Sequence, residues 1–108
     1  METITLYRPI NNEEFDLIKL SNFSKFPPRL DSHPIFYPVV NLKYALELSQ
    51  WNMHSYGAGF ITKFKIKKEF LDNFEIHCVG DNYHLEYWIP AEELDKFNSN
   101  IVGKIELI

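Results

Sequence analysis

The chain has 108 residues, of which 45% are hydrophobic and 24% charged, and its formal net charge is -4. This balance is typical of a single globular domain spanning residues 1–108, and it excludes a disordered chain, a collagen-like repeat and a coiled coil. Because acidic side chains outnumber basic ones, the composition argues against a protein that binds nucleic acid through its phosphates.

The sequence also bears on the compartment in which the protein works. The N-terminal residues contain no basic segment followed by an apolar run, so we expect no secretory signal peptide. No apolar stretch approaches the roughly 18 residues of a membrane-spanning helix, so no membrane partner is expected. The single cysteine, Cys78, cannot form an internal disulfide and fits a reducing compartment. We therefore expect a cytoplasmic domain.

The chain begins with an alternating, β-rich segment over residues 3–8. We expect this strand to end at Pro9, because proline has no N–H for a ladder hydrogen bond. Asn11 or Asn12 is a suitable N-cap for the helix that follows, and this helix should stop at residues 21–22.

Residues 23–38 contain four prolines and have no helical or strand-like pattern. They are nevertheless rich in apolar side chains, which would form an aggregation-prone patch if they stayed in water. We therefore expect a loop that is packed onto the core, with three side chains largely buried: Phe26, Leu30 and Phe36.

The next helix is expected from Asn41, its N-cap, to about Gln50. The residues expected to point inward from this helix are Leu42, Ala45 and Leu46. Residues 52–59 are polar and contain glycine, so they are expected to form a connection without regular structure.

The second half of the chain is dominated by strand patterns, expected at residues 60–67, 74–79, 83–89 and 101–108. Short helical segments are expected at residues 68–73 and, opened by Pro90, at residues 91–97. Helices do not alternate strictly with strands, and residues 74–79 and 83–89 are expected to form a hairpin. This order predicts an α+β fold with a mainly antiparallel sheet.

Several kinds of site have little support. The four histidines include no i, i+4 pair of the kind that a zinc site on a helix requires, so no metal site is expected. Cys78 lies in an apolar strand, where a small buried thiol is the usual case. The lysine run formed by Lys63, Lys65, Lys67 and Lys68 is compatible with anion binding, but a solvated sheet face is the favoured interpretation.

The segment from Tyr83 to Pro90 is more informative. On a strand, His84, Glu86 and Trp88 share one face, which places a carboxylate between an imidazole and an indole. Such a carboxylate can hold a cationic or hydroxyl-bearing ligand. The alternative is an ordinary surface glutamate paired with a lysine of the neighbouring strand.

Several segments together resemble a family of small bacterial proteins labelled "ADP-ribosylation/crystallin". The resemblance covers nearly the whole chain, and the segments that carry it are 6–9, 26–30, 34–39, 59–64, 86–94 and 97–98. The order of elements is similar to a minimal ADP-ribosyltransferase fold, which has a split antiparallel sheet. The fold implied by the resemblance is therefore an ADP-ribosyltransferase-like α+β domain.

The resemblance also implies where a cofactor would bind. Arg8 matches the signature arginine of the first strand and would hold a phosphate or ribose of NAD through its forked guanidinium. Tyr37 would stack on the nicotinamide ring, and Thr62 belongs to a degenerate version of the family's hydroxyl-bearing strand. Arg29, in the proline-rich loop, would supply a second arginine to the pocket wall.

Glu86 matches the catalytic glutamate of the family's late strand, although His84 stands where a Glu or Gln is common two residues earlier. A carboxylate at this position would stabilise the oxocarbenium-like state that forms when the nicotinamide–ribose bond breaks. The implied function is binding of NAD or a related nucleotide, with transfer of ADP-ribose to a protein acceptor or cleavage of that bond. The alternative is a non-catalytic ligand- or protein-binding module on the same scaffold.

Overall fold

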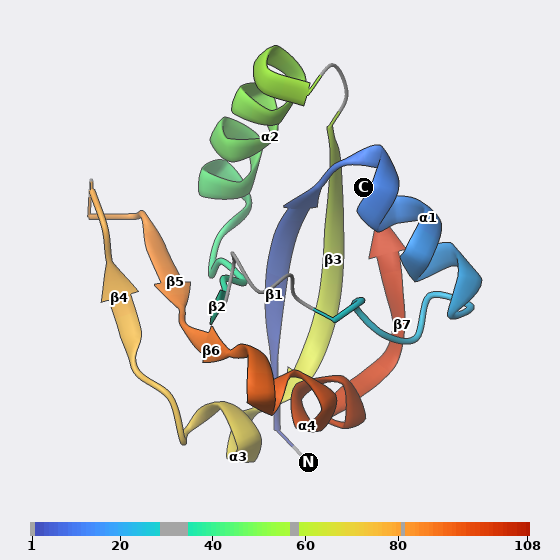
Figure 1. The fold of residues 1–108 in the computed structure, drawn as a ribbon. Helices are drawn as coiled ribbons and strands as arrows, with labels where there is room; N and C mark the ends of the chain where they lie inside the picture. The colour runs from blue at the N-terminus through green and yellow to red at the C-terminus, as the bar shows by residue number, and fades with distance from the viewer. Residues whose placement is uncertain (1, 29–34, 57–58, 81) are drawn as a thin grey trace.

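The computed structural model describes residues 2–28, 35–56, 59–80 and 82–108, with the backbone alone for residues 51–56. Its central element is a three-stranded antiparallel sheet in the order β1-β3-β7, formed by Thr3–Ile10, Phe60–Lys67 and Ile101–Leu107 (Figure 1). The register of β3 against β7 shifts between Lys63 and Lys65. Gly103 lies beside this bulge with a φ of 81°, a conformation that glycine adopts without strain.

Two further strand pairs and four helices complete the described part of the chain. The pairs are β2 (Ile35–Phe36) with β6 (Ile89–Pro90), and β4 (Ile76–Cys78) with β5 (Leu85–Tyr87). The helices are α1 (Asn12–Leu20), α2 (Leu42–Tyr56), α3 (Lys68–Leu71) and α4 (Leu94–Ser99), the last preceded by the 3-10 turn Ala91–Glu93. All strand pairs are antiparallel, so the predicted α+β fold with a mainly antiparallel sheet is confirmed.

Val39 connects the central sheet to the β4–β5 pair. Its backbone exchanges two hydrogen bonds with Tyr7 of β1, at 2.9 and 2.8 Å, and the residues on either side of it bond those on either side of Glu86 in β5. Residues directly opposite one another in antiparallel strands point to the same face. Tyr7, Val39 and Glu86 therefore share the face that α2 covers with Tyr44 and Ala45.

The prediction that Pro9 ends the first strand is wrong, since β1 continues to Ile10 and Pro9 lies opposite Ile61. The backbone N–H and C=O of Tyr7 point toward Val39 and away from β3. In a strand the backbone groups of residues two apart point to the same side, so those of Pro9 also point away from β3. The N–H that Pro9 lacks would therefore not have bonded to β3. Proline is tolerated at a strand edge for this reason.

Asn11 and Asn41 act as helix N-caps, as predicted: their Oδ1 atoms accept from the backbone N–H three residues later, at 2.9 and 2.8 Å. The predicted end of the second helix near Gln50 is wrong, because α2 runs to Tyr56. The predicted connection at 52–59 is therefore helical up to residue 56, and residues 57–58 lie outside the described residues.

Two predictions of burial are also wrong. Leu46 on α2 is 47% exposed. Tyr44, on the opposite side of the helix, is buried instead. Cys78 on β4 is exposed, and its neighbours Ile76 and Val79 are also exposed. β4 lies at the outer side of the hairpin (Figure 1), so its apolar composition does not mark an interior strand.

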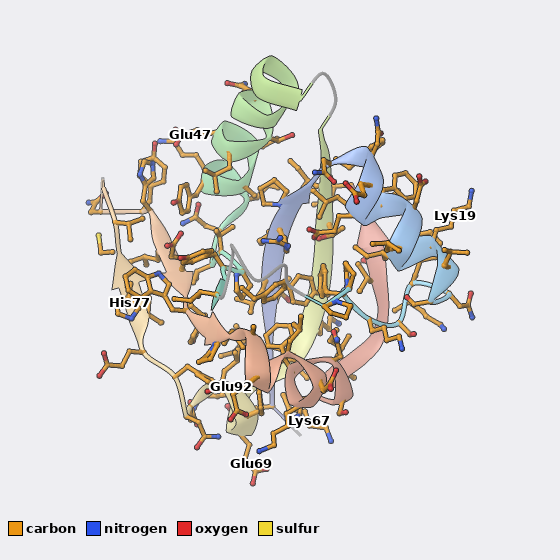
Figure 2. All side chains as sticks on the ribbon, in the orientation of Figure 1. Lys19, Glu47, Lys67, Glu69, His77 and Glu92 are labelled. Atoms are coloured by element: carbon orange, nitrogen blue, oxygen red, sulfur yellow. The ribbon has the colours of Figure 1, made fainter. Side chains whose placement is uncertain are left out.

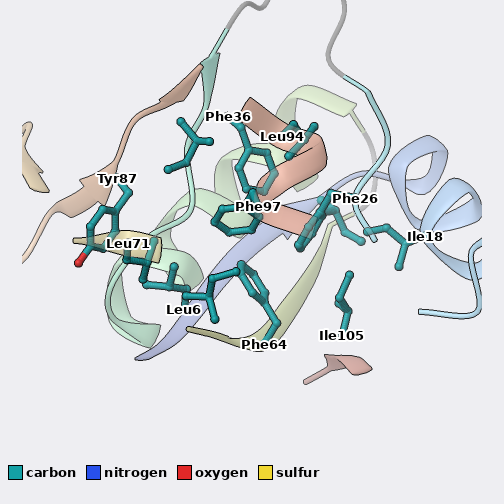
Figure 3. Close-up of a cluster of buried hydrophobic side chains, with 13 residues drawn as sticks. Leu6, Ile18, Phe26, Phe36, Phe64, Leu71, Tyr87, Leu94, Phe97 and Ile105 are labelled. Atoms are coloured by element: carbon teal, nitrogen blue, oxygen red, sulfur yellow. The ribbon is translucent and has the colours of Figure 1, made fainter. Parts of the chain in front are cut away.

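The main core lies on the other face of the central sheet and is built around four phenyl rings from four segments (Figure 3). Phe26, Phe36, Phe64 and Phe97 form a closed set in which neighbouring ring centroids are 4.9–5.9 Å apart. Contacts of this kind stabilise beyond the area they bury, because aromatic edges and faces attract. Aromatic residues make up 16% of the chain, and they are thus used in part to build the core of a small domain.

Residues 26 and 36 confirm that the proline-rich segment is packed down, since both side chains are fully buried. Leu30, the third residue of that prediction, lies outside the described residues. The backbone of Phe26 is fixed as well: its N–H donates to Asn98 Oδ1 at 2.9 Å, and its carbonyl accepts from Asn98 Nδ2 at 3.0 Å. Phe26 is therefore held to α4 although it lies in no helix or strand, whereas Phe36, at the other end of the predicted loop, lies in the short strand β2.

We predict that Phe26→Ala lowers the free energy of unfolding by about 3–5 kcal/mol, because it removes one ring from the closed set and leaves a cavity. Phe26→Leu should cost less, and urea-induced unfolding measures both. Leu20→Ala is the matched control: Leu20 is 83% exposed, so its loss should change stability by less than about 0.5 kcal/mol. Equal stabilities for Phe26→Ala and the control would contradict the packing described here.

Candidate functional site

A pocket of about 500 Å³ opens where β1 separates from the segment that contains Val39. After the Tyr7–Val39 pair, the next hydrogen-bonded pair would be Pro9 with Tyr37, and Pro9 has no N–H to donate. The two chain segments part at this point, leaving a gap in the sheet. The pocket is lined by Arg8, Pro9, Ile10, Asn11, Glu14, Tyr37, Tyr44, Leu48, Glu86 and Trp88.

Glu86 is the buried carboxylate of this pocket, with a relative exposure of 8%. Its Oε1 accepts from Trp88 Nε1 at 2.8 Å, and its Oε2 accepts from the hydroxyl of Tyr44 at 3.1 Å. Among the described residues, no lysine, arginine or histidine forms an ion pair with it. The alternative interpretation, a surface glutamate paired with a lysine of the neighbouring strand, is therefore wrong.

Tyr44 places a second ring donor beside Glu86 from α2. Burial of the phenol, and then the charge of Glu86, raise the pKa of Tyr44 to about 12. The phenol therefore stays protonated and keeps donating to the carboxylate. Its ring is stacked on His84, with centroids 4.4 Å apart and planes at 15°.

Glu47, one turn further along α2, holds His84 in this position. Its Oε2 lies 2.8 Å from His84 Nε2, and its Oε1 accepts from the hydroxyl of Tyr83. The bond from Tyr83, followed by that from His84, holds the pKa of Glu47 below its ordinary value. Figure 2 shows Glu47 extending from α2 toward the β4–β5 hairpin. These contacts fix α2 to the hairpin one turn beyond Tyr44.

Trp88 forms a wall of the pocket and is also supported by a histidine. The indole is stacked on His77 of β4, labelled in Figure 2, with centroids 3.7 Å apart and planes at 9°. Tyr37 meets Trp88 nearly at a right angle, with centroids 6.1 Å apart. Trp88 and Tyr37 keep 38% and 39% of their surface exposed, so both rings remain accessible from the pocket.

Arg8 reaches the same pocket but is already engaged. Its Nε and Nη2 donate to the two carboxylate oxygens of Glu14, at 2.7 and 2.9 Å, and its guanidinium lies 4.6 Å from the ring centroid of Phe36. Arg8 also follows Tyr7 in the strand, so it leaves the sheet on the face opposite to Glu86. Arg8 and Glu86 both line the pocket because the pocket lies in the gap between β1 and the segment that contains Val39.

The predicted site residues thus fall into three groups. Arg8, Tyr37 and Glu86 line one pocket. His84 and Thr62 do not line it: His84 acts through its stack on Tyr44, and Thr62 is fully buried, with its Oγ1 donating to the backbone carbonyl of Arg8 at 2.8 Å. The remaining residue, Arg29, lies outside the described residues.

Sequence reasoning missed Tyr44, Glu14 and Glu47. A usable signal existed for Tyr44, because the Asn41 cap sets the phase of the helix and places Tyr44, Ala45 and Leu48 on one face. No comparable signal pairs Glu47 with His84, since these residues lie on elements that meet only in the folded chain.

Within the described ranges, no group of three or more His, Cys, Asp or Glu side chains is arranged to hold a metal ion. None of the helices described has the length and apolar character needed to cross a membrane. Comparison of the chain with family models, curated protein sequences and solved structures gives no match.

We predict that the free energy of unfolding falls by about 2–3 kcal/mol more in the wild-type protein than in Tyr44→Phe as the pH rises from 10 to 12. An unfolded tyrosine ionises near pH 10, and Tyr44 in the folded protein ionises at about 12. The stabilisation is complete below pH 10 and is lost as the pH approaches 12. Urea unfolding at several pH values measures it, and parallel curves for the two proteins would contradict the raised pKa of Tyr44.

Proposed function

We propose that the domain binds a small ligand that carries a positive charge or a cluster of hydroxyl groups in the pocket at Glu86. The observation that carries this proposal is a buried carboxylate that opens onto a pocket and has no cationic partner among the described residues. Taking a charge out of water is costly unless it is paired or fully hydrogen-bonded. Two neutral donors offset part of that cost, and a bound cation or donor would offset more.

The size and lining of the pocket support a small organic ligand. A volume of about 500 Å³ is within the range of small-molecule sites, and the walls combine three aromatic rings with three charged side chains. Of the two functions left open by the sequence, a non-catalytic binding module is favoured by the state of Arg8. A phosphate would have to displace Glu14 from two charge-assisted hydrogen bonds, each contributing about 1.5–3 kcal/mol.

The second candidate is binding of NAD followed by cleavage of the nicotinamide–ribose bond or transfer of ADP-ribose. It is favoured by one observation, the convergence of Arg8, Tyr37 and Glu86 on the same pocket. The nicotinamide ring carries a positive charge and its ribose carries hydroxyls, so this half of NAD has the chemistry that Glu86 would accept. The carboxylate would then stabilise positive charge on the ribose as the bond breaks.

We predict that NAD⁺ and nicotinamide riboside raise the thermal unfolding temperature, whereas ADP-ribose, which lacks the cationic ring, does not. A ligand at 100 times its dissociation constant adds roughly 2.7 kcal/mol, which is several degrees for a domain of this size. Glu86→Gln should reduce the shift. The control is Glu92→Gln, which removes the same charge from an exposed position outside the pocket. An unchanged shift in Glu86→Gln would contradict the proposed site.

Release of nicotinamide distinguishes binding from catalysis. In the non-catalytic case, NAD⁺ stabilises the protein and no nicotinamide accumulates. In the catalytic case, nicotinamide accumulates with the wild-type protein, Glu86→Gln loses turnover while keeping some binding, and Arg8→Ala weakens binding by about 1.5–3 kcal/mol because a charged hydrogen bond is lost. Turnover that survives in Glu86→Gln would contradict the catalytic candidate.

A further inference from the structure

We infer that the pocket at Glu86 recognises an organic cation of the quaternary ammonium type, held by the Glu86 charge and by the rings of Trp88 and Tyr37. This inference rests on the proposed function and specifies its ligand class. Three properties of the pocket lead to it: its net charge, the arrangement of its rings and the limited access to its carboxylate.

The charges that line the pocket sum to one negative charge among the described residues. Arg8 and Glu14 neutralise each other through a bidentate pair at 2.7 and 2.9 Å. Glu86 is left, with hydrogen bonds from two neutral groups, the indole of Trp88 and the phenol of Tyr44. Because Glu86 is buried, its charge is screened less than it would be in water. The field in the pocket therefore favours a monovalent cation.

The rings form two adjoining walls of a cage. Trp88 and Tyr37 stand at 88° to each other with centroids 6.1 Å apart, and both line the pocket. His77 covers one face of the indole and does not line the pocket. The Trp88 side chain itself does line the pocket. Aromatic faces attract cations electrostatically, tryptophan most strongly, and cages of this kind bind methylated ammonium groups.

The limited access to the carboxylate discriminates between kinds of cation. Both oxygens of Glu86 already accept a hydrogen bond, and the residue is 8% exposed. A compact ammonium or metal ion would lose its tightly held water and find few oxygen atoms in exchange. A quaternary ammonium group has no N–H to satisfy and spreads its charge over methyl groups. It therefore gains from the rings and from the nearby charge without a direct hydrogen bond.

The test compares choline with its neutral carbon isostere, 3,3-dimethylbutan-1-ol, and with ammonium chloride at the same ionic strength. Binding is followed by the fluorescence of Trp88 in a Trp51→Phe background and, independently, by thermal unfolding of the wild-type protein. We expect saturable binding of choline, binding of the isostere at least about tenfold weaker, and no saturable response to ammonium. Equal binding of choline and the isostere would overturn the inference, because the pocket would then recognise shape alone.

Variants locate the site. Glu86→Gln, which keeps the shape of the side chain, should weaken choline binding at least about tenfold, and Trp88→Leu should do the same. Tyr37→Phe should retain binding and Tyr37→Ala should lose it, because the ring and not the hydroxyl forms the wall. Glu92→Gln is the matched control and should bind choline as the wild-type protein does. Undiminished binding in Glu86→Gln or Trp88→Leu would overturn the assignment to this pocket.

The experiments distinguish a failure of the quaternary ammonium inference from a failure of the proposed function. If NAD⁺ stabilises the protein through Glu86 and choline does not bind, the proposed function stands and the quaternary ammonium inference falls. If neither choline nor NAD⁺ binds in a protein that unfolds cooperatively, both fall. Saturable choline binding that depends on Glu86 and Trp88 supports both.

Discussion

One residue, Val39, joins the two halves of this fold. Its backbone pairs with Tyr7 on one side, and the residues flanking it pair with β5 on the other, so two bridges at one residue place the central sheet beside the hairpin. The bridge does not extend toward Tyr37, because Pro9 has no N–H for the next pair. The same constraint therefore fixes the position of Glu86 and opens the gap beside it. A longer ladder at this point would close the sheet and remove the pocket.

Glu86 is held in place by neutral groups that are themselves supported. Each of its two ring donors is stacked on a histidine: Tyr44 on His84, and Trp88 on His77. The donors are thus restricted in orientation before any ligand arrives, which reduces the entropy lost on binding. No lysine, arginine or histidine in the described part of the chain pairs with the carboxylate, so these residues fix its orientation without neutralising its charge. Arg8, by contrast, is both oriented and neutralised by Glu14.

The sequence was most informative where a local rule decides the structure. The alternation in Phe60–Lys67 and the asparagine caps at Asn11 and Asn41 correctly predicted a strand and two helix starts. Predictions failed where the environment of a residue decides its structure. Pro9 is tolerated because its backbone faces away from β3, and Cys78 is exposed because β4 is the outer strand of the hairpin. The shared face of His84, Glu86 and Trp88 follows from strand periodicity, but the partner Tyr44 depends on how α2 docks. The resemblance to ADP-ribosyltransferases stays a prediction.

The exposed strand β4 has a thermodynamic consequence for the pocket. Ile76 and Cys78 bury little surface, so β4 is attached mainly by its short ladder to β5 and by the stack of His77 on Trp88. Strands with so little buried area detach in local unfolding events that leave the rest of the domain intact. Trp88 is stacked on His77 of β4 and also lines the pocket. Any occupant that orders this indole will therefore slow amide exchange in β4, although it never touches that strand.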